Sequence, residues 1–244
     1  MIQSSNFEVI KKSMADAGNE LSDLQINQLI DYYDLLIEWN SFMNLTAITE
    51  FNDVVMKHFV DSLAPLTDKA FKFKKDSSII DVGTGAGFPG IPLKIACPEI
   101  KLTLCDALNK RVGFLNAVIE KCNLDNTIAV HLRAEEGGRD RMYREKFDYS
   151  VARAVAKLPT LCEYTIPFVK PDGFFIAYKT LNQEDLPEAS EKAALKLGCV
   201  FERQYQYSLK ESDSNRVLYY YHKKNKTPIA YPRLGGKPSS APLQ

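Results

Sequence analysis

The stretch that decides the fold of this 244-residue chain is Ile79-Ile80-Asp81-Val82-Gly83-Thr84-Gly85-Ala86-Gly87-Phe88-Pro89-Gly90. Its apolar beginning predicts a buried strand, its spaced glycines predict a tight loop, and the residues that follow predict a helix. Because glycine has no Cβ, the backbone of such a loop can turn sharply and approach a ligand closely. The stretch therefore predicts an adenosine-cofactor loop at the end of a strand. A tight turn without a ligand is the alternative.

The charge and the prolines of this loop distinguish two kinds of adenosine cofactor. The glycines also match the G-x-G-x-x-G pattern of dinucleotide sites, but a pyrophosphate at a helix start needs free backbone N–H donors. Pro89 and Pro92 remove donors there, and Asp81 adds negative charge. S-adenosylmethionine has no phosphate and carries a sulfonium and an ammonium, so we predict it as the cofactor over NAD. The residues predicted at its site are Asp81, Gly83, Gly85 and Gly87.

A second acidic residue supports a nucleoside ligand. Asp106 ends the next predicted strand and lies 21 residues after Gly85, which fits the spacing of about 20 for a ribose-binding acid. Its carboxylate could accept hydrogen bonds from both ribose hydroxyls. The alternative is a helix cap, because Asp106 also precedes the predicted helix Leu108–Lys121.

Alternating strands and helices after residue 77 predict an α/β fold with a mainly parallel sheet, as in Rossmann-like methyltransferases. A helical extension precedes it, in which the apolar face of the first helix should continue through Trp39 and Phe42. The predicted strands are Ser78–Val82, Lys101–Cys105, Thr127–His131, Phe147–Val151, Gly173–Tyr178 and a late antiparallel pair, Val200–Tyr207 and Arg216–His222, seven in all. The predicted helices are Ser22–Phe42, Asn52–Pro65, Ile91–Cys97, Leu108–Lys121, a short one after Ala134, Leu158–Val169 and Gln183–Leu197.

The charge of the chain is divided unevenly, although it sums to zero. Residues 1–68 hold eleven acidic and three basic residues, and the remainder carries a net charge of +8. This asymmetry favours a polyanionic partner for the basic part. We divide the chain into an N-terminal helical extension (1–68), a methyltransferase domain (69–225) and a basic C-terminal tail (226–244), expected to be extended, with a frayed terminus as the alternative.

Composition places the chain among cytoplasmic proteins. The five cysteines are scattered without a C-x-x-C pair, which predicts reduced, buried thiols. No apolar run is long enough for a membrane span, and the N-terminus lacks the form of a signal peptide. The three histidines lie far apart in the sequence, so we expect no metal site and no membrane association.

Several longer motifs make the chain resemble one family, the bacterial 16S ribosomal RNA guanine-N7 methyltransferases, also called the glucose-inhibited division protein B family. The resemblance implies a Rossmann-like enzyme that uses S-adenosylmethionine, with 16S ribosomal RNA or the small ribosomal subunit as its partner. It spans nearly the whole chain. The motifs are Asn44-Leu45-Thr46-Ala47-Ile48, Lys57-His58-Phe59-Val60-Asp61-Ser62-Leu63, the extended glycine loop through Leu93, Lys110-Arg111-Val112-Gly113-Phe114-Leu115, Arg133-Ala134-Glu135, Ala152-Arg153-Ala154-Val155-Ala156 and Tyr231-Pro232-Arg233.

The resemblance also implies residue roles. Gly83 and Phe88 should contact the cofactor, Ala134 and Glu135 should border the adenine, and Arg153 should lie where cofactor and substrate meet. Guanine N7 carries a lone pair and no proton, so catalysis should rest on placement of the reactants. We therefore predict that Arg153 orients the base or a phosphate as the catalytic residue. The alternative is a salt bridge from Arg153 to Asp148 or Glu163.

Lys110, Arg111 and Arg233 are the residues predicted to contact RNA. A solvated first helical turn is the alternative for the first two. His58 could also touch RNA, but a structural role is the more common one for such a histidine. Three competing functions are a methyltransferase acting on a small molecule or a protein, an NAD-dependent oxidoreductase, and a non-catalytic RNA-binding module.

Overall fold

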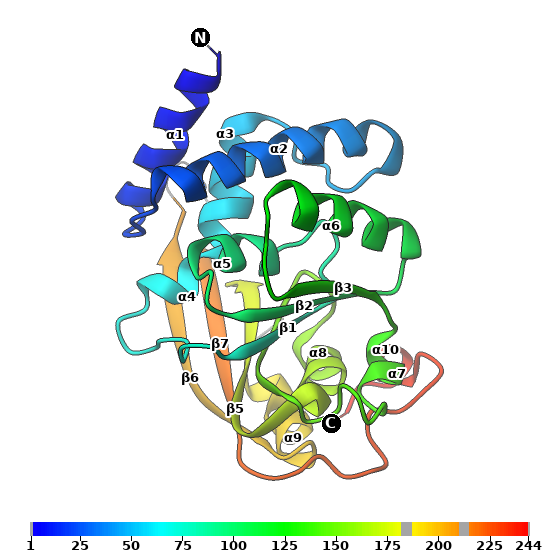
Figure 1. Ribbon diagram of the computed structural model, residues 1–244. Helices are drawn as coiled ribbons and strands as arrows, with labels where there is room; N and C mark the ends of the chain where they lie inside the picture. The colour runs from blue at the N-terminus through cyan, green and yellow to red at the C-terminus, as the bar shows by residue number, and fades with distance from the viewer. Residues whose placement is uncertain (1, 182–186, 210–214, 244) are drawn as a thin grey trace.

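Figure 1 shows the computed structural model, which describes residues 2–181, 187–209 and 215–243. Within these residues, seven strands form one sheet in the order β3-β2-β1-β4-β5-β7-β6. β1 to β5 run parallel, and β7 is antiparallel to both β5 and β6. The bounds are β1 Ser78–Val82, β2 Lys101–Asp106, β3 Thr127–His131, β4 Phe147–Arg153, β5 Val169–Thr180, β6 Cys199–Ser208 and β7 Asn215–Lys223.

The order of the strands reverses between β1 and β4. β1 pairs with β2 on one side and with β4 on the other, so the connections that leave β1 and β4 run to opposite sides of the sheet. In open parallel sheets, ligands bind in the crevice beyond the carboxyl ends of the strands at such a reversal. The glycine loop follows β1 directly and therefore borders this crevice.

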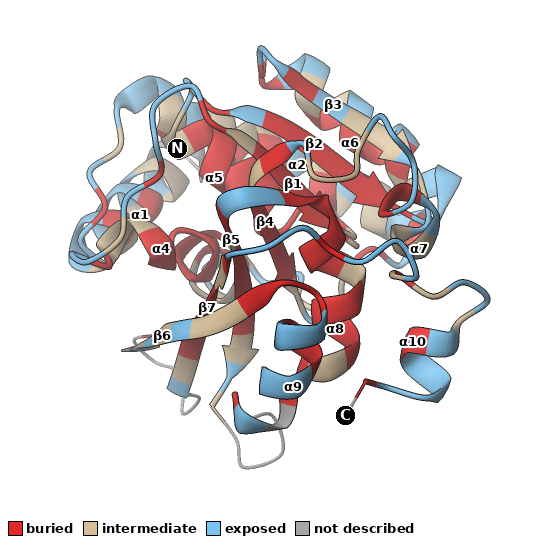
Figure 2. Ribbon diagram, turned by 90° about the horizontal axis from the view of Figure 1, so that it is seen from below, coloured by how far each residue is buried: buried red, intermediate tan, exposed pale blue. Residues whose placement is uncertain are grey.

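Helices cover both faces of the sheet, and the central strands are buried between them (Figure 2). The N-terminal helices stack with α5 and α6 on one face, while α8 and α9 cover the other (Figure 1). The helices are α1 Ile2–Asp16, α2 Asp23–Met43, α3 Phe51–Val54, the π-helix η1 Val55–Val60, α4 Ala64–Thr67, α5 Gly90–Ala96, α6 Asn109–Lys121, α7 Ala134–Gly137, α8 Leu158–Thr165, the 3-10 helix η2 Ile166–Phe168, α9 Glu188–Lys196 and α10 Lys237–Ser240.

The helix α2 joins the N-terminal extension to the sheet. Ser22 caps it through a capping box with Gln25, and the Gln25 amide nitrogen reaches on to donate to the carbonyl of Ile95 at 2.7 Å. The apolar side of α2 belongs to the same core as β1, α5 and α6. The extension and the sheet thus share one hydrophobic core, while the division of the chain at residue 68 stays a prediction.

The predicted fold class and strand pattern are confirmed, and a few boundaries were wrong. Phe42 is 66% exposed rather than buried. The helix predicted over Asn52–Pro65 is interrupted. The residues expected on its inward face are all fully buried: Val54, Val55, Phe59 and Leu63. Residues 183–186 of the predicted helix Gln183–Leu197 lie outside the described residues. All five cysteines are free thiols, four of them buried. Among the helices described, none is both long and apolar enough to cross a membrane.

Candidate active site

The glycine loop turns through conformations that L side chains rarely adopt. Gly83, Gly85 and Gly87 have φ angles of +70°, +61° and +98°. A Cβ on Gly87 would lie 2.4 Å from Cδ1 of Ile91, whereas a Cβ on Gly85 would meet nothing within 4 Å. Gly87 is therefore required by both conformation and space, and Gly85 by conformation alone.

Asp81 holds the two ends of this loop together. Its side chain is fully buried, and its Oδ2 accepts hydrogen bonds from the Thr84 hydroxyl at 2.7 Å and from the Gly90 amide at 2.8 Å. Its Oδ1 has no hydrogen-bond partner in the described part of the chain. Burial raises the pKa of Asp81 to about 7. Asp81 does not line any of the pockets at this edge, so its predicted contact with the cofactor stays a prediction.

Asp106 fixes the middle of the loop. Its Oδ2 accepts from the Gly85 amide at 2.9 Å, and its Oδ1 accepts from the Leu108 amide at 2.9 Å at the start of α6. Arg111 lies 3.4 Å from the same carboxylate. The N-cap of α6 is Leu108, and no side chain caps this helix, so the helix-cap alternative for Asp106 is not observed, and ribose binding by Asp106 stays a prediction.

Four further amides of this loop are also bonded within the protein. Gly83 and Thr84 donate to the carbonyl of Cys105 at 2.8 and 3.1 Å, and Gly87 and Phe88 donate to the carbonyl of Thr84 at 2.9 and 3.1 Å. A phosphate at a helix start depends on amides that are free to donate. These donors are already used, so the loop is poorly suited to a pyrophosphate.

A pocket of about 530 Å³ opens beside this loop, within the range of roughly 300–1,000 Å³ that is usual for small-molecule sites. Three predicted cofactor residues line it, Gly83, Ala134 and Glu135, whereas Gly85, Gly87, Phe88, Asp106 and Arg153 do not. The carboxylates of Glu135 and Glu136 suit a cationic ligand, and the apolar side chains suit an adenosine. The lining is Val82, Gly83, Cys105, Ala107, Leu132, Arg133, Ala134, Glu135, Glu136, Val155, Tyr164, Leu234, Gly235 and Gly236.

Arg153, at the end of β4, bonds to the N-terminal extension. Its Nη1 donates to Asp61 at 2.8 Å and to the Lys57 carbonyl at 3.1 Å. The proposed alternative partners were wrong, because Asp148 pairs with Lys170 at 2.6 Å and Glu163 pairs with Arg233. Asp61 lies 92 residues away from Arg153, and no local pattern in the sequence signals such a contact.

His58 is held neutral within this cluster. Its Nδ1 lies 3.1 Å from Nη2 of Arg153, and its Nε2 lies 3.0 Å from the Thr46 hydroxyl. The same Nδ1 also lies 3.1 Å from the carbonyl of Lys57, which can only accept, so it faces a donor on one side and an acceptor on the other. Burial and the charge of Arg153 lower the pKa of His58 to about 3. Phe88 stacks on the imidazole at 4.4 Å and lies 5.0 Å below the guanidinium, so Phe88 packs in this cluster rather than against the pocket.

A smaller, basic pocket of about 150 Å³ adjoins the larger one. The connection after β4 separates them, since Arg153 and Ala154 line the small pocket and Val155 lines the large one. Asp61, at its wall, also accepts from the Tyr207 hydroxyl at 2.7 Å. Among the described lining residues, Arg153, Lys179 and Arg216 are cationic and Asp61 is acidic. The lining is Asp61, Arg153, Ala154, Tyr178, Lys179, Thr180, Tyr207 and Arg216.

The three residues predicted to contact RNA differ in their surroundings. Lys110 is exposed in the first turn of α6, and Arg111 beside it pairs with Asp106. Arg233 forms a two-pronged ion pair with the fully buried Glu163, with Nη2 to Oε2 at 2.7 Å and Nε to Oε1 at 2.9 Å. Contact of these residues with RNA stays a prediction.

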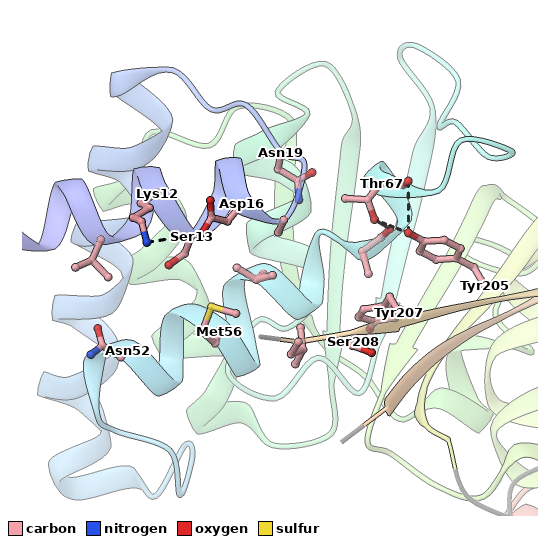
Figure 3. A pocket seen from close by; sticks show the side chains of 15 residues that line it. Lys12, Ser13, Asp16, Asn19, Asn52, Met56, Thr67, Tyr205, Tyr207 and Ser208 are labelled. Carbon is pink, nitrogen blue, oxygen red and sulfur yellow. Dashed lines mark hydrogen bonds and ion pairs between the residues drawn. The ribbon is translucent and has the colours of Figure 1, made fainter. Parts of the chain in front are cut away.

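A third cavity, of about 430 Å³, lies between α1, η1 and β6 (Figure 3). Lys12 and Asp16 pair across 3.8 Å at its side, and the hydroxyls of Thr67 and Tyr205 meet at 3.1 Å on another wall. None of the predicted site residues lines it. The predicted site residues that line a described pocket, Gly83, Ala134, Glu135 and Arg153, therefore lie at the two pockets near the ends of β1 and β4.

Comparison with known proteins identifies the family of this chain. A family model described as rRNA small subunit methyltransferase G (GidB) matches residues 25–217. The ribosomal RNA small subunit methyltransferase G of Lachnoclostridium phytofermentans is 48% identical over 232 residues, covering 95% of each chain. The chain belongs to the rRNA small subunit methyltransferase G family. A second member, from Acetivibrio thermocellus, is 49% identical over 228 residues, covering 93% of this chain and 92% of its own length.

Membership in the methyltransferase G family makes the chain an S-adenosylmethionine-dependent methyltransferase, as the motifs predicted. A solved structure shares the fold: the cyclase SpnF has a TM-score of 0.54 and 12% identity, covering 68% of this chain and 82% of its own. At this identity the likeness concerns the fold alone. The resemblance seen in the sequence and the fold class are both confirmed.

Proposed function

We propose that this protein transfers a methyl group from S-adenosylmethionine to N7 of a guanine in small-subunit (16S) ribosomal RNA. The observation that carries the proposal is the glycine loop, whose amides are bonded inside the protein and which borders a pocket with two glutamates. Such a loop suits a cationic methyl donor. The printed names of the relatives, ribosomal RNA small subunit methyltransferase G, support the RNA substrate.

The residues around the site match chemistry that needs no general base. S-adenosylmethionine supplies a methyl group on a positively charged sulfur, and guanine N7 offers a lone pair without a proton. His58 is neutral because its pKa is about 3, and its two nitrogens are occupied by Arg153 and Thr46. The cluster therefore contributes fixed position and fixed charge, and placement of this kind can lower a barrier by roughly 7–11 kcal/mol.

The small basic pocket would bind the target guanine or a neighbouring phosphate of the RNA. Among the described residues that line it, Arg153, Lys179 and Arg216 are cationic and Asp61 is acidic, so the pocket suits the O6 of a guanine or a phosphate oxygen. Arginine commonly identifies guanine through O6 and N7, but a bond to N7 would block attack on the methyl group. We therefore assign Arg153 to orientation of the base or of a phosphate.

Phosphate contacts outside the pocket would add affinity. Lys110 is exposed at the start of α6 and is the most accessible of the three predicted RNA contacts. Arg111 and Arg233 each share their charge with a carboxylate. The target base must leave its stack to reach a pocket, which favours binding dominated by phosphates and local RNA shape.

The proposal is tested by tritiated methyl transfer from S-adenosylmethionine to small ribosomal subunits, to free 16S RNA, and to pools of metabolites and proteins. The expected product is 7-methylguanosine in the small-subunit RNA, identified by mass spectrometry of its nucleosides. Arg216→Ala, in the basic pocket, should reduce transfer, whereas Lys101→Ala, at an exposed lysine at the opposite end of β2, should not. Labelled metabolite or protein without labelled RNA would overturn the substrate, and binding of NAD in place of S-adenosylhomocysteine would overturn the cofactor.

A further inference from the structure

The C-terminal tail forms one wall of the larger pocket. Leu234, Gly235 and Gly236 line it together with the glycine loop and the α7 turn, although Gly235 lies 150 residues after Gly85 and 101 residues after Ala134. The match to the methyltransferase G family ends at residue 217, before the tail begins. The alternative of a frayed terminus does not hold for this part of the tail, which continues from β7 to α10 beside α8 (Figure 1).

Two arginines from the α7–β4 connection hold the first half of the tail. The guanidinium groups of both arginines donate to backbone carbonyls of the tail. Gly138 allows this close approach, since a Cβ there would lie 2.9 Å from Cγ of Pro232. The bonds run from Arg144 to the carbonyls of Thr227, Pro228 and Tyr231, at 2.7, 3.2 and 2.7 Å, and from Arg139 to those of Ala230 and Pro232, at 3.2 and 2.8 Å.

A buried ion pair fixes the tail next to the pocket. The carboxylate of Glu163, on α8, is fully buried and receives the side chain of Arg233 as well as its backbone amide at 2.7 Å. Leu234 follows directly. Beyond the pocket, Thr160 donates to the carbonyl of Pro238 at 2.9 Å, so the segment between these two anchors is tied to α8 on both sides.

We propose that residues 234–236 are part of the cofactor site, with Leu234 as a direct contact and the Arg233–Glu163 pair as the positioning element behind it. The pocket has glycines on this wall, Gly235 and Gly236, whose φ angles of +68° and +70° shape the turn over it. Leu234 is 49% exposed, which leaves about half of its apolar surface for a ligand to cover. The proposal rests on the proposed function, because it takes S-adenosylmethionine as the ligand.

The test measures the dissociation constant of S-adenosylhomocysteine by calorimetry for the full-length protein and two alanine variants. Leu234→Ala should raise it about fivefold to tenfold, since each methylene removed from a fully covered apolar contact weakens binding about fourfold, and a ligand would cover only part of this side chain. Ile229→Ala is the matched control: this residue is 88% exposed, lies in the same tail and lines none of the pockets. Leu234→Met should restore most of the affinity.

Kinetics and hydrogen exchange separate this role from simple support of the fold. In the paired variant Glu163→Gln with Arg233→Gln, the KM for S-adenosylmethionine should rise severalfold, while kcat, measured at saturating RNA because Arg233 is itself a predicted RNA contact, stays within about twofold. Saturating S-adenosylhomocysteine should slow amide exchange at residues 234–236 and leave residue 229 unchanged. If the unaltered protein binds S-adenosylhomocysteine and Leu234→Ala binds it equally well, the tail proposal is wrong. If the unaltered protein does not bind it, the cofactor assignment itself fails.

Discussion

Replacing Asp81 with asparagine should remove a pH dependence from the stability of the fold. Burial raises the pKa of Asp81 from an ordinary 3.8 to about 7, while the unfolded chain keeps the ordinary value. At a pH between these two pKa values, Asp81 is protonated in the folded protein and ionised in the unfolded chain. The stability contributed by this proton is therefore complete below about pH 4 and is lost as the pH rises towards 7.

The size of this effect follows from the shift. A difference of about three pKa units corresponds to about 4 kcal/mol in total, of which about 2 kcal/mol falls between about pH 5 and pH 7. Asparagine keeps an oxygen that can accept from Thr84 and Gly90, as Oδ2 of Asp81 does, and cannot ionise. Urea unfolding of both proteins at a series of pH values should therefore show Asp81→Asn gaining about 2 kcal/mol relative to the original protein over this range.

Asp148 provides a control of opposite sign. Burial alone would raise its pKa, but hydrogen bonds from Lys170 and Ser78 lower the pKa overall. Asp148→Asn should therefore lose stability relative to the original protein as the pH rises through the acid range, before levelling off. Parallel curves for Asp81→Asn and the original protein from about pH 5 to pH 8 would refute the argument for Asp81.

Three further perturbations test the site. Gly87→Ala should cost more than about 2 kcal/mol of unfolding free energy, because its Cβ meets Ile91 at 2.4 Å, whereas Gly85→Ala should cost about 1 kcal/mol from conformation alone; equal losses in urea unfolding would contradict this. Arg153→Ala should destabilise the fold by about 3 kcal/mol, because Asp61 loses its closest cation while buried, and should reduce methyl transfer strongly; normal turnover rules out its assigned role. Methyl transfer to RNA should fall steeply with added salt, and a flat response would argue against extensive phosphate contact.

The sheet and the glycine loop could be predicted because their signals are local. Apolar residues such as Ile79, Ile80 and Val82 indicate a buried strand by their own hydrophobicity, and all three are buried. The turn that follows needs φ angles above +60°, which glycine adopts readily. Boundaries failed where tertiary contacts decide them. The predicted helix Leu158–Val169 stops at Thr165, because Pro167 follows in a 3-10 turn and Val169 already pairs with Phe147 in the sheet.

The partners of charged side chains could not be predicted, because they depend on contacts between distant segments. Arg153 meets Asp61 across 92 residues, and Arg233 meets Glu163 across 70. Each of these carboxylates is buried, and a buried charge requires a partner of opposite sign. The sequence shows that the charges exist, but the packing of the N-terminal extension and of the tail against the sheet determines which ones meet.

The loop was predicted to prefer a cation because its prolines remove amide donors, and the structure adds a second cause. Proline at position 89 removes one donor, but the structure shows that the neighbouring amides are used as well. A glycine loop has no side chains to satisfy its own backbone, so the two carboxylates at the strand ends, Asp81 and Asp106, accept from Gly90 and Gly85. The same bonds that keep the loop in shape therefore leave few of its amides free to donate to a phosphate. Stability of the loop and selection against a pyrophosphate thus come from one set of hydrogen bonds.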